Sequence, residues 1–171
     1  MRTLIVGGGA TGGYLADLLT AGNRDVTVLV REGTQERLAT AGLRIRDVSG
    51  DVRTTPVRAV GIDGIDTVFD LVLMAVRGDA VATAIADVVP AVGPHTRVLS
   101  VANGMAQLEA LRDAFGDDRV VGAAAEMATS LVDGIIDVSL PGVRLTIGSL
   151  DTGRATHRQR WPPNSMSAVS R

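Results

Sequence analysis

A glycine-rich turn near the amino terminus constrains this chain more than any other feature. The turn follows a short apolar run at residues 3–6, and Gly7, Gly9 and Gly12 keep the spacing G-x-G-x-x-G. In such a turn the first glycine permits a sharp exit from a strand, the second lets the backbone approach a phosphate, and the third lets a helix lie against the strand. The spacing therefore predicts a strand, a turn and a helix whose amino terminus faces an anion.

The alternative is a turn that only connects a strand to a helix. The residues after the turn favour a ligand site instead. Apolar residues recur at helical spacing over residues 14–19, and a β-branched run at 26–30 predicts a second strand. A strand, a helix and a parallel strand form a right-handed crossover. This unit predicts a dinucleotide site, and the residues expected at its phosphates are Gly7, Gly8, Gly9, Ala10, Thr11 and Gly12.

Strands and helices keep alternating along most of the chain. Residues 43–60 alternate around a Ser-Gly-Asp turn, which predicts a hairpin or a pair of short strands, and residues 130–140 and 143–147 are typical of extended segments. The order predicts an α/β fold of the Rossmann type, with a doubly wound and mostly parallel sheet, over residues 1–150. Further helices are expected at residues 34–41, 80–89 and 105–115, and further strands at 70–76, 97–101 and 119–124.

Residues 151–171 differ in character from the rest. From Arg154 onward the sequence is rich in Arg, Pro and Ser and shows neither a helical nor a strand period. We therefore expect an irregular tail there instead of a second domain. A reading-frame change in a gene of biased base composition would produce such an ending, so a truncated or frame-shifted chain is expected.

Composition excludes several classes of function. The formal net charge is −2 with both signs scattered, which provides no basic face for nucleic acid. The chain has no cysteine, so cysteine metal sites and disulfides are excluded, and no metal site is expected. The longest apolar run is about seven residues, far below the roughly 20 needed to cross a bilayer, and the amino terminus lacks the apolar region of a signal peptide. We expect a cytoplasmic protein without a membrane partner.

The residue at the end of the second predicted strand bears on cofactor choice. An acidic residue there selects NAD through the ribose 2′-hydroxyl, whereas an arginine accommodates the 2′-phosphate of NADP. Arg31 occupies this position and favours NADP. Glu32 follows immediately, which leaves NAD as the alternative, with Arg31 as a solvated charge.

Several segments together resemble one known family. These segments are residues 7–31, 70–77, 100–104 and 119–122, and the resemblance extends over about residues 1–153. They resemble the amino-terminal half of the ketopantoate reductases (2-dehydropantoate 2-reductases). The resemblance implies NADPH-dependent reduction of the ketone of a branched 2-oxo acid to a 2-hydroxy acid, a step toward pantothenate and coenzyme A.

The resemblance also carries individual residues. Arg31 matches the arginine that receives the NADP phosphate, and Asn103 matches an asparagine near the nicotinamide and the substrate. Arg77 stands where the family commonly has a lysine near the cofactor, which keeps the charge but changes its geometry. The alternatives are ordinary turn chemistry for Asn103, which precedes a glycine, and a solvated charge for Arg77.

The family also has parts that this sequence lacks. Its carboxy-terminal helical domain brings a lysine that acts as general acid, whereas this chain contains no lysine at all. We therefore expect a cofactor-binding half that is inactive alone and that self-associates through apolar surface. The alternatives are a non-catalytic NADP-binding module, or a reductase for a different small 2-oxo acid.

Overall fold

The computed structural model describes residues 1–101, 105–140 and 142–148, together with the backbone of residues 158–160. Its main sheet has eight strands: β1 (Arg2–Val6), β2 (Asp25–Leu29), β5 (Arg58–Val60), β6 (Phe69–Met74), β7 (Val92–Ser100), β8 (Val120–Glu126), β11 (Arg144–Gly148) and β12 (Arg158–Arg160). Their order is β12-β11-β8-β7-β6-β1-β2-β5. The six strands from β8 to β5 are parallel, and β11 is antiparallel to β8. The predicted doubly wound, mostly parallel sheet is confirmed.

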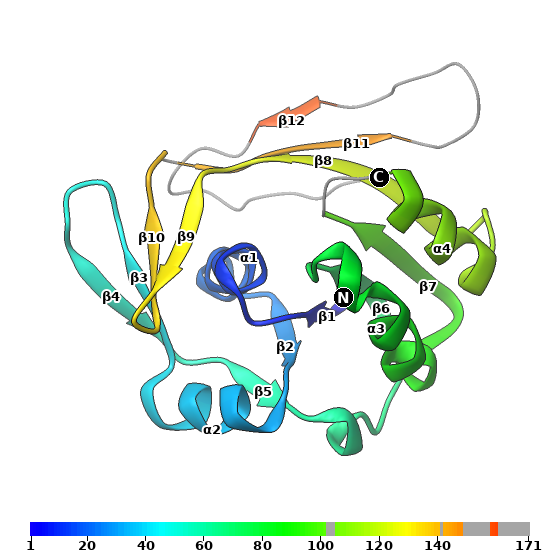
Figure 1. Ribbon diagram of the computed structural model, residues 1–171, viewed down its shortest axis with the longest axis horizontal. Coiled ribbons are helices and arrows are strands. Elements are labelled where there is room, and N and C mark those ends of the chain that lie inside the picture. The colour runs from blue at the N-terminus through cyan, green and yellow to red at the C-terminus, as the bar shows by residue number, and fades with distance from the viewer. Residues whose placement is uncertain (102–104, 141, 149–157, 161–171) are drawn as a thin grey trace.

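In the described part of the chain, four α-helices cover the two faces of this sheet. They are α1 (Ala10–Ala21), α2 (Glu32–Ala41), α3 (Val81–Val88) and α4 (Met105–Phe115). Successive side chains of a strand point to opposite faces, and the core is divided in the same way. Ile5 packs on the α1 face, whereas Leu4 and Val6 pack with α3 and α4 on the other face. Figure 1 shows α3 and α4 on one side of the sheet and α1 on the other.

A second, four-stranded sheet lies against α1. It contains β3 (Leu43–Arg46), β4 (Val52–Thr55), β9 (Thr129–Val132) and β10 (Ile135–Val138), in the order β4-β3-β10-β9. The β3–β4 hairpin confirms the pair of strands expected around the Ser-Gly-Asp turn. The last part of the expected region, β5, joins the main sheet beside β2 instead. Figure 1 shows β9 and β10 running beside α1.

Three boundaries differ from the sequence predictions. The single extended segment expected at residues 130–140 was wrong, because Asp133 and Gly134 have positive φ angles of 49° and 75° and turn the chain into the β9–β10 hairpin. Strand β7 begins at Val92 and not at residue 97. Within the expected irregular tail, β12 pairs with β11. Residues 149–157 and 161–171 lie outside the described residues, so the domain division at residue 150 stays a prediction.

No helix in the described part of the chain is long and apolar enough to cross a membrane.

Candidate functional site

The parallel strands bring several loops to one edge of the main sheet. Val6 at the end of β1 lies opposite Leu29 of β2 on one side and Met74 of β6 on the other. Met74 in turn lies opposite Ser100, the last residue of β7. The order of the strands reverses between β1 and β6, and ligands of open α/β sheets bind outside the carboxyl ends of the strands at such a reversal. The loops after β1, β2, β6 and β7 therefore form the candidate site.

The glycine turn has the geometry that its spacing predicts. Gly7 has a φ of +105°, which favours glycine, and a Cβ added to Gly12 would overlap the carbonyl oxygen of Gly7. A Cβ added to Gly9 would meet no atom within 4 Å, so the space above this backbone is open. The three glycines thus provide a turn, a close helix–strand contact and an open position for a ligand.

Helix α1 begins beside that open position. The first backbone hydrogen bond of the helix runs from the Gly13 N–H to the Gly9 carbonyl oxygen, at 2.8 Å, and no side chain caps this end among the described residues. The N–H groups of Ala10, Thr11 and Gly12 therefore have no partner within the helix. Free N–H groups and the helix dipole favour an anion. The residues present fit the phosphates of a dinucleotide.

The other two glycines of the turn also pack closely. A Cβ on Gly8 would lie 2.7 Å from Val30 Cγ1, and one on Gly13 would overlap Ile136 of the second sheet. We expected Gly8 at the phosphates from the sequence, and that role stays a prediction. The motif spacing gives no reason for either glycine, since the contacts come from Val30, which follows β2, and from β10.

Arg31 and Arg77 both lie at the carboxyl edge of the sheet. Arg31 is the residue before α2, and its carbonyl oxygen accepts hydrogen bonds from the N–H groups of Thr34 and Gln35, each at 2.9 Å. Arg77 follows β6 and precedes the single turn Gly78–Ala80. Both arginines are exposed, and neither guanidinium has a partner in the described part of the chain. Both cations are available to an anionic ligand.

Asn103, the remaining predicted site residue, lies outside the described residues. Two buried polar side chains flank its segment: Ser100 at the end of β7 and Gln107 in the first turn of α4, which are 3% and 6% exposed. Ser100 Oγ and Gln107 Nε2 have no hydrogen-bond partner among the described residues. Sequence reasoning missed both, and the available signal was a polar residue at the end of an apolar strand and another on the buried face of a helix.

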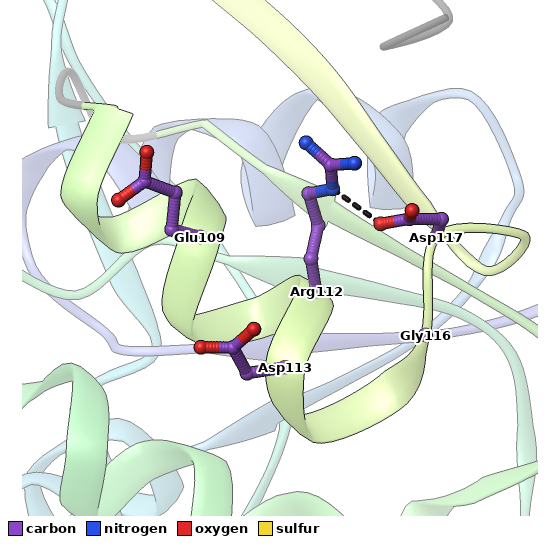
Figure 2. A pocket seen from close by; sticks show the side chains of 5 residues that line it. All are labelled: Glu109, Arg112, Asp113, Gly116 and Asp117. Carbon is purple, nitrogen blue, oxygen red and sulfur yellow. Dashed lines mark hydrogen bonds and ion pairs between the residues drawn. The ribbon is translucent and has the colours of Figure 1, made fainter.

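A shallow pocket beside α4 lies away from this site. Figure 2 shows that its lining side chains come from α4 and the turn that follows it, and that Arg112 forms an ion pair with Asp117. The hydrogen bond that Arg112 donates within this ion pair lowers the pKa of Asp117 below its usual value. Because α4 starts at the carboxyl edge and runs back to the start of β8, the pocket lies at the opposite edge. It is lined by Glu109, Arg112, Asp113, Gly116 and Asp117, so its excess of carboxylates disfavours a phosphorylated ligand.

Residues 3–152 match the family described as ketopantoate reductase PanE/ApbA. The chain belongs to this family. It is 30% identical over 171 residues to the uncharacterized oxidoreductase YkpB of Bacillus subtilis, and the match covers 99% of this chain and 55% of the relative. It is 33% identical over 106 residues to the 2-dehydropantoate 2-reductase of Mesorhizobium japonicum, which covers 61% of this chain and 32% of that protein.

The fold also matches solved structures of ketopantoate reductases. The 2-dehydropantoate 2-reductase of Geobacter metallireducens superposes with a TM-score of 0.80 at 28% identity, over 90% of this chain and 51% of that chain. The chain therefore spans about half the length of the full-length proteins it resembles. The sequence-based resemblance to the ketopantoate reductases is confirmed. The family is one of oxidoreductases that use NAD(P)H and act on 2-oxo acids.

Proposed function

We propose that this chain is the cofactor-binding part of an NADPH-dependent 2-oxo acid reductase of the ketopantoate reductase type. One observation carries the proposal. The open position at Gly9 lies at the amino terminus of α1, and Arg31 stands at the neighbouring strand end with no partner among the described residues. Open space over the Gly9 backbone and a free guanidinium at adjacent loops match a dinucleotide that carries an additional 2′-phosphate.

Each of these groups has a distinct role in the proposal. The unpaired N–H groups at the start of α1 bind the pyrophosphate, and Arg31 forms charge-assisted hydrogen bonds to the 2′-phosphate. Arg77 contacts the cofactor from the loop after β6. Asn103 orients the nicotinamide and the substrate, a role that rests on the family resemblance alone. A cytoplasmic location is part of the same proposal.

The reaction itself needs a group that this chain lacks. When bound, a reduced nicotinamide would supply the hydride that reduces the ketone carbon of the 2-oxo acid. The oxygen of that ketone then gains negative charge and needs a proton donor. The resemblance implies a lysine for this role, and the 171 residues contain none. We therefore expect cofactor binding without appreciable turnover for this chain by itself.

The substrate is proposed by analogy with two relatives. The Mesorhizobium protein and the Geobacter structure are both named 2-dehydropantoate 2-reductase, which supports ketopantoate. The relative that covers nearly the whole chain is named only as an oxidoreductase, so another 2-oxo acid is the alternative within the same chemistry. A non-catalytic NADP-binding module is the second candidate function, and the absence of lysine favours it.

Two measurements on the purified chain test the proposal. Calorimetric titration should give one NADPH per chain and tighter binding of NADPH than of NADH. An assay of NADPH oxidation with ketopantoate should give a turnover below about 1 per second, the lower end of the usual range for enzymes. Absence of binding would reject the proposed cofactor role. Turnover in the usual range would show that a residue other than lysine donates the proton.

Light scattering on the same sample tests the expected self-association. A monomer at all concentrations would contradict that expectation.

A further inference from the structure

The helix that begins at the glycine turn is attached to the second sheet through a buried carboxylate. Asp17 lies in α1 and is 1% exposed. Its Oδ2 accepts a hydrogen bond from Arg53 Nη2 at 2.5 Å, and its Oδ1 accepts one from Thr55 Oγ1 at 2.5 Å. Both partners belong to β4. One carboxylate therefore connects α1 to a strand that is 36 residues further along the chain.

The same side of α1 makes close apolar and polar contacts with neighbouring segments. Gly13 leaves just enough room for Ile136 of β10. A Cβ added to Gly13 would also lie 3.2 Å from the side chain of Leu43 in β3. Tyr14 is 5% exposed, and burial raises the pKa of its hydroxyl while the nearby Gly142 backbone lowers it. The second sheet and the segment before β11 thus hold the first half of α1 against the main sheet.

Arg53 supplies the counter-charge for a buried carboxylate. The Arg53 side chain is 46% exposed, but its partner Asp17 is almost fully buried. Removing the guanidinium leaves a buried carboxylate without its counter-charge, and such a group either draws in water or moves outward. Asp17 lies on the helix whose first turn presents the N–H groups, eight residues beyond Gly9. At 1.5 Å per residue this is about 12 Å along the helix axis.

We infer that Arg53 is a positioning residue for the dinucleotide: through Asp17 it fixes α1 so that the first-turn N–H groups are aligned on the pyrophosphate. This inference rests on the proposed cofactor role. A phosphate site built on backbone groups tolerates displacements of only about 0.5 Å. A helix that stays packed but is less tightly fixed in orientation must be ordered again on binding, which lowers affinity without removing any contact to the ligand.

The second sheet contains a matched control for this ion pair. Arg46 Nη1 lies 2.7 Å from Asp137 Oδ1, and these side chains are 41% and 26% exposed. This pair joins β3 to β10 within the sheet and leaves α1 untouched. Arg46→Met therefore removes an ion pair from the same sheet without releasing the helix.

The sole tyrosine of the chain reports on the packing of the helix. Burial raises the pKa of Tyr14 above its usual value, while the nearby positive charge of Arg53 lowers it. In the Arg53→Met variant, tyrosinate absorbance should therefore show a Tyr14 pKa that is still raised. That result establishes that α1 remains packed while its charge partner is gone.

The deciding experiment is calorimetric titration of NADPH into the full chain, at a temperature well below unfolding. We expect Arg53→Met to weaken binding about fivefold or more at unchanged stoichiometry, and Arg46→Met to leave the Kd within about twofold. Because nearly every chain is folded at that temperature, a loss of global stability by itself leaves the apparent Kd unchanged. Arg53→Lys should restore most of the affinity, since lysine supplies the same charge to Asp17.

Thr55→Val provides a second, milder variant if Arg53→Met fails to fold. It removes one hydrogen bond to Asp17, keeps the ion pair, and should weaken NADPH binding about twofold to threefold. An unchanged Kd for the folded Arg53 and Thr55 variants, or equal weakening by Arg46→Met, would overturn the inference while the cofactor role stands. No NADPH binding by the unmodified chain would overturn both.

Discussion

The two halves of the carboxyl edge of the main sheet are built on different principles. The half formed by β1, β2 and β5 presents backbone N–H groups at a glycine turn, with Arg31 beside them. The half formed by β6, β7 and β8 presents side chains, among them the exposed Arg77 and the buried Ser100 and Gln107. The proposed phosphate site therefore depends on one local strand–turn–helix unit, whereas the second half draws its side chains from several separate elements.

The largest effect should come from Gly12, where the first half admits no side chain. A Cβ there overlaps the Gly7 carbonyl oxygen, which belongs to the backbone and cannot move aside. Gly12→Ala should lower the free energy of unfolding by about 3 kcal/mol, measured by urea denaturation. Gly33→Ala is the control, because no atom lies within 4 Å of its added Cβ. Equal stability of the two variants would contradict the close helix–strand contact.

Gly9 should separate binding from folding within the same turn. Its φ of −77° suits alanine and its surroundings are open, so Gly9→Ala should change the unfolding free energy by less than about 1 kcal/mol. The added methyl group occupies the space proposed for the pyrophosphate, and NADPH binding should weaken about tenfold or more. Unchanged affinity in calorimetry would place the phosphates somewhere else.

Arg31 should set cofactor selectivity in the first half. A hydrogen bond to a charged group contributes about 1.5–3 kcal/mol, so Arg31→Ala should weaken NADPH binding about tenfold to a hundredfold and leave NADH nearly unchanged. Glu32→Gln is the matched variant, because it removes a negative charge from the neighbouring residue. It should tighten NADPH binding a few-fold, since an anion beside the 2′-phosphate is gone. Parallel titrations with both cofactors measure this, and equal losses for NADPH and NADH would exclude a 2′-phosphate contact.

Arg77 should have a smaller effect, and one that does not depend on the 2′-phosphate. It lies after β6 in the second half of the edge. Arg77→Ala should weaken NADPH and NADH about equally, by roughly threefold, as expected for an exposed charge. A loss confined to NADPH would move Arg77 to the adenosine half and break the division between the two halves.

Tyr14 should give the smallest effect, on stability at high pH. Burial raises the pKa of its hydroxyl in the folded chain above the usual 10.0. Between the pKa of the unfolded chain and that of the folded chain, only the folded chain keeps this proton. The contribution of Tyr14 to the free energy of unfolding is therefore constant below about pH 10 and falls above it. Denaturation of the unmodified chain and of Tyr14→Phe compares them, and the variant should lose less stability above pH 10. Identical pH profiles would show that the hydroxyl is not shielded from water.

The main sheet was predictable from sequence because its strands are buried on both faces. Such strands are unbroken apolar runs, as at residues 71–76, and glycine spacing places the turn after β1. The second sheet was only partly predictable. The β3–β4 hairpin is local, whereas β3 pairs with β10 across about 90 residues, and no local period reports such a pairing. The Asp133-Gly134 pair was the signal for the missed β9–β10 hairpin.

The candidate site divides in the same way. The glycine turn and the position of Arg31 follow from spacing, because both depend on where one strand ends. The pair formed by Asp17 and Arg53, and the unpartnered Ser100 and Gln107, depend on packing between elements far apart in sequence. A polar residue in an apolar pattern marks such positions, but only the fold shows what it faces.

A crystal structure of the chain with NADPH would locate the phosphates of the cofactor relative to the glycine turn and Arg31. We predict pyrophosphate oxygens over Gly9, about 2.7–3.2 Å from the N–H groups at the start of α1, with the 2′-phosphate against the Arg31 guanidinium. A pyrophosphate bound elsewhere, or a 2′-phosphate that leaves Arg31 without contact, would contradict this prediction.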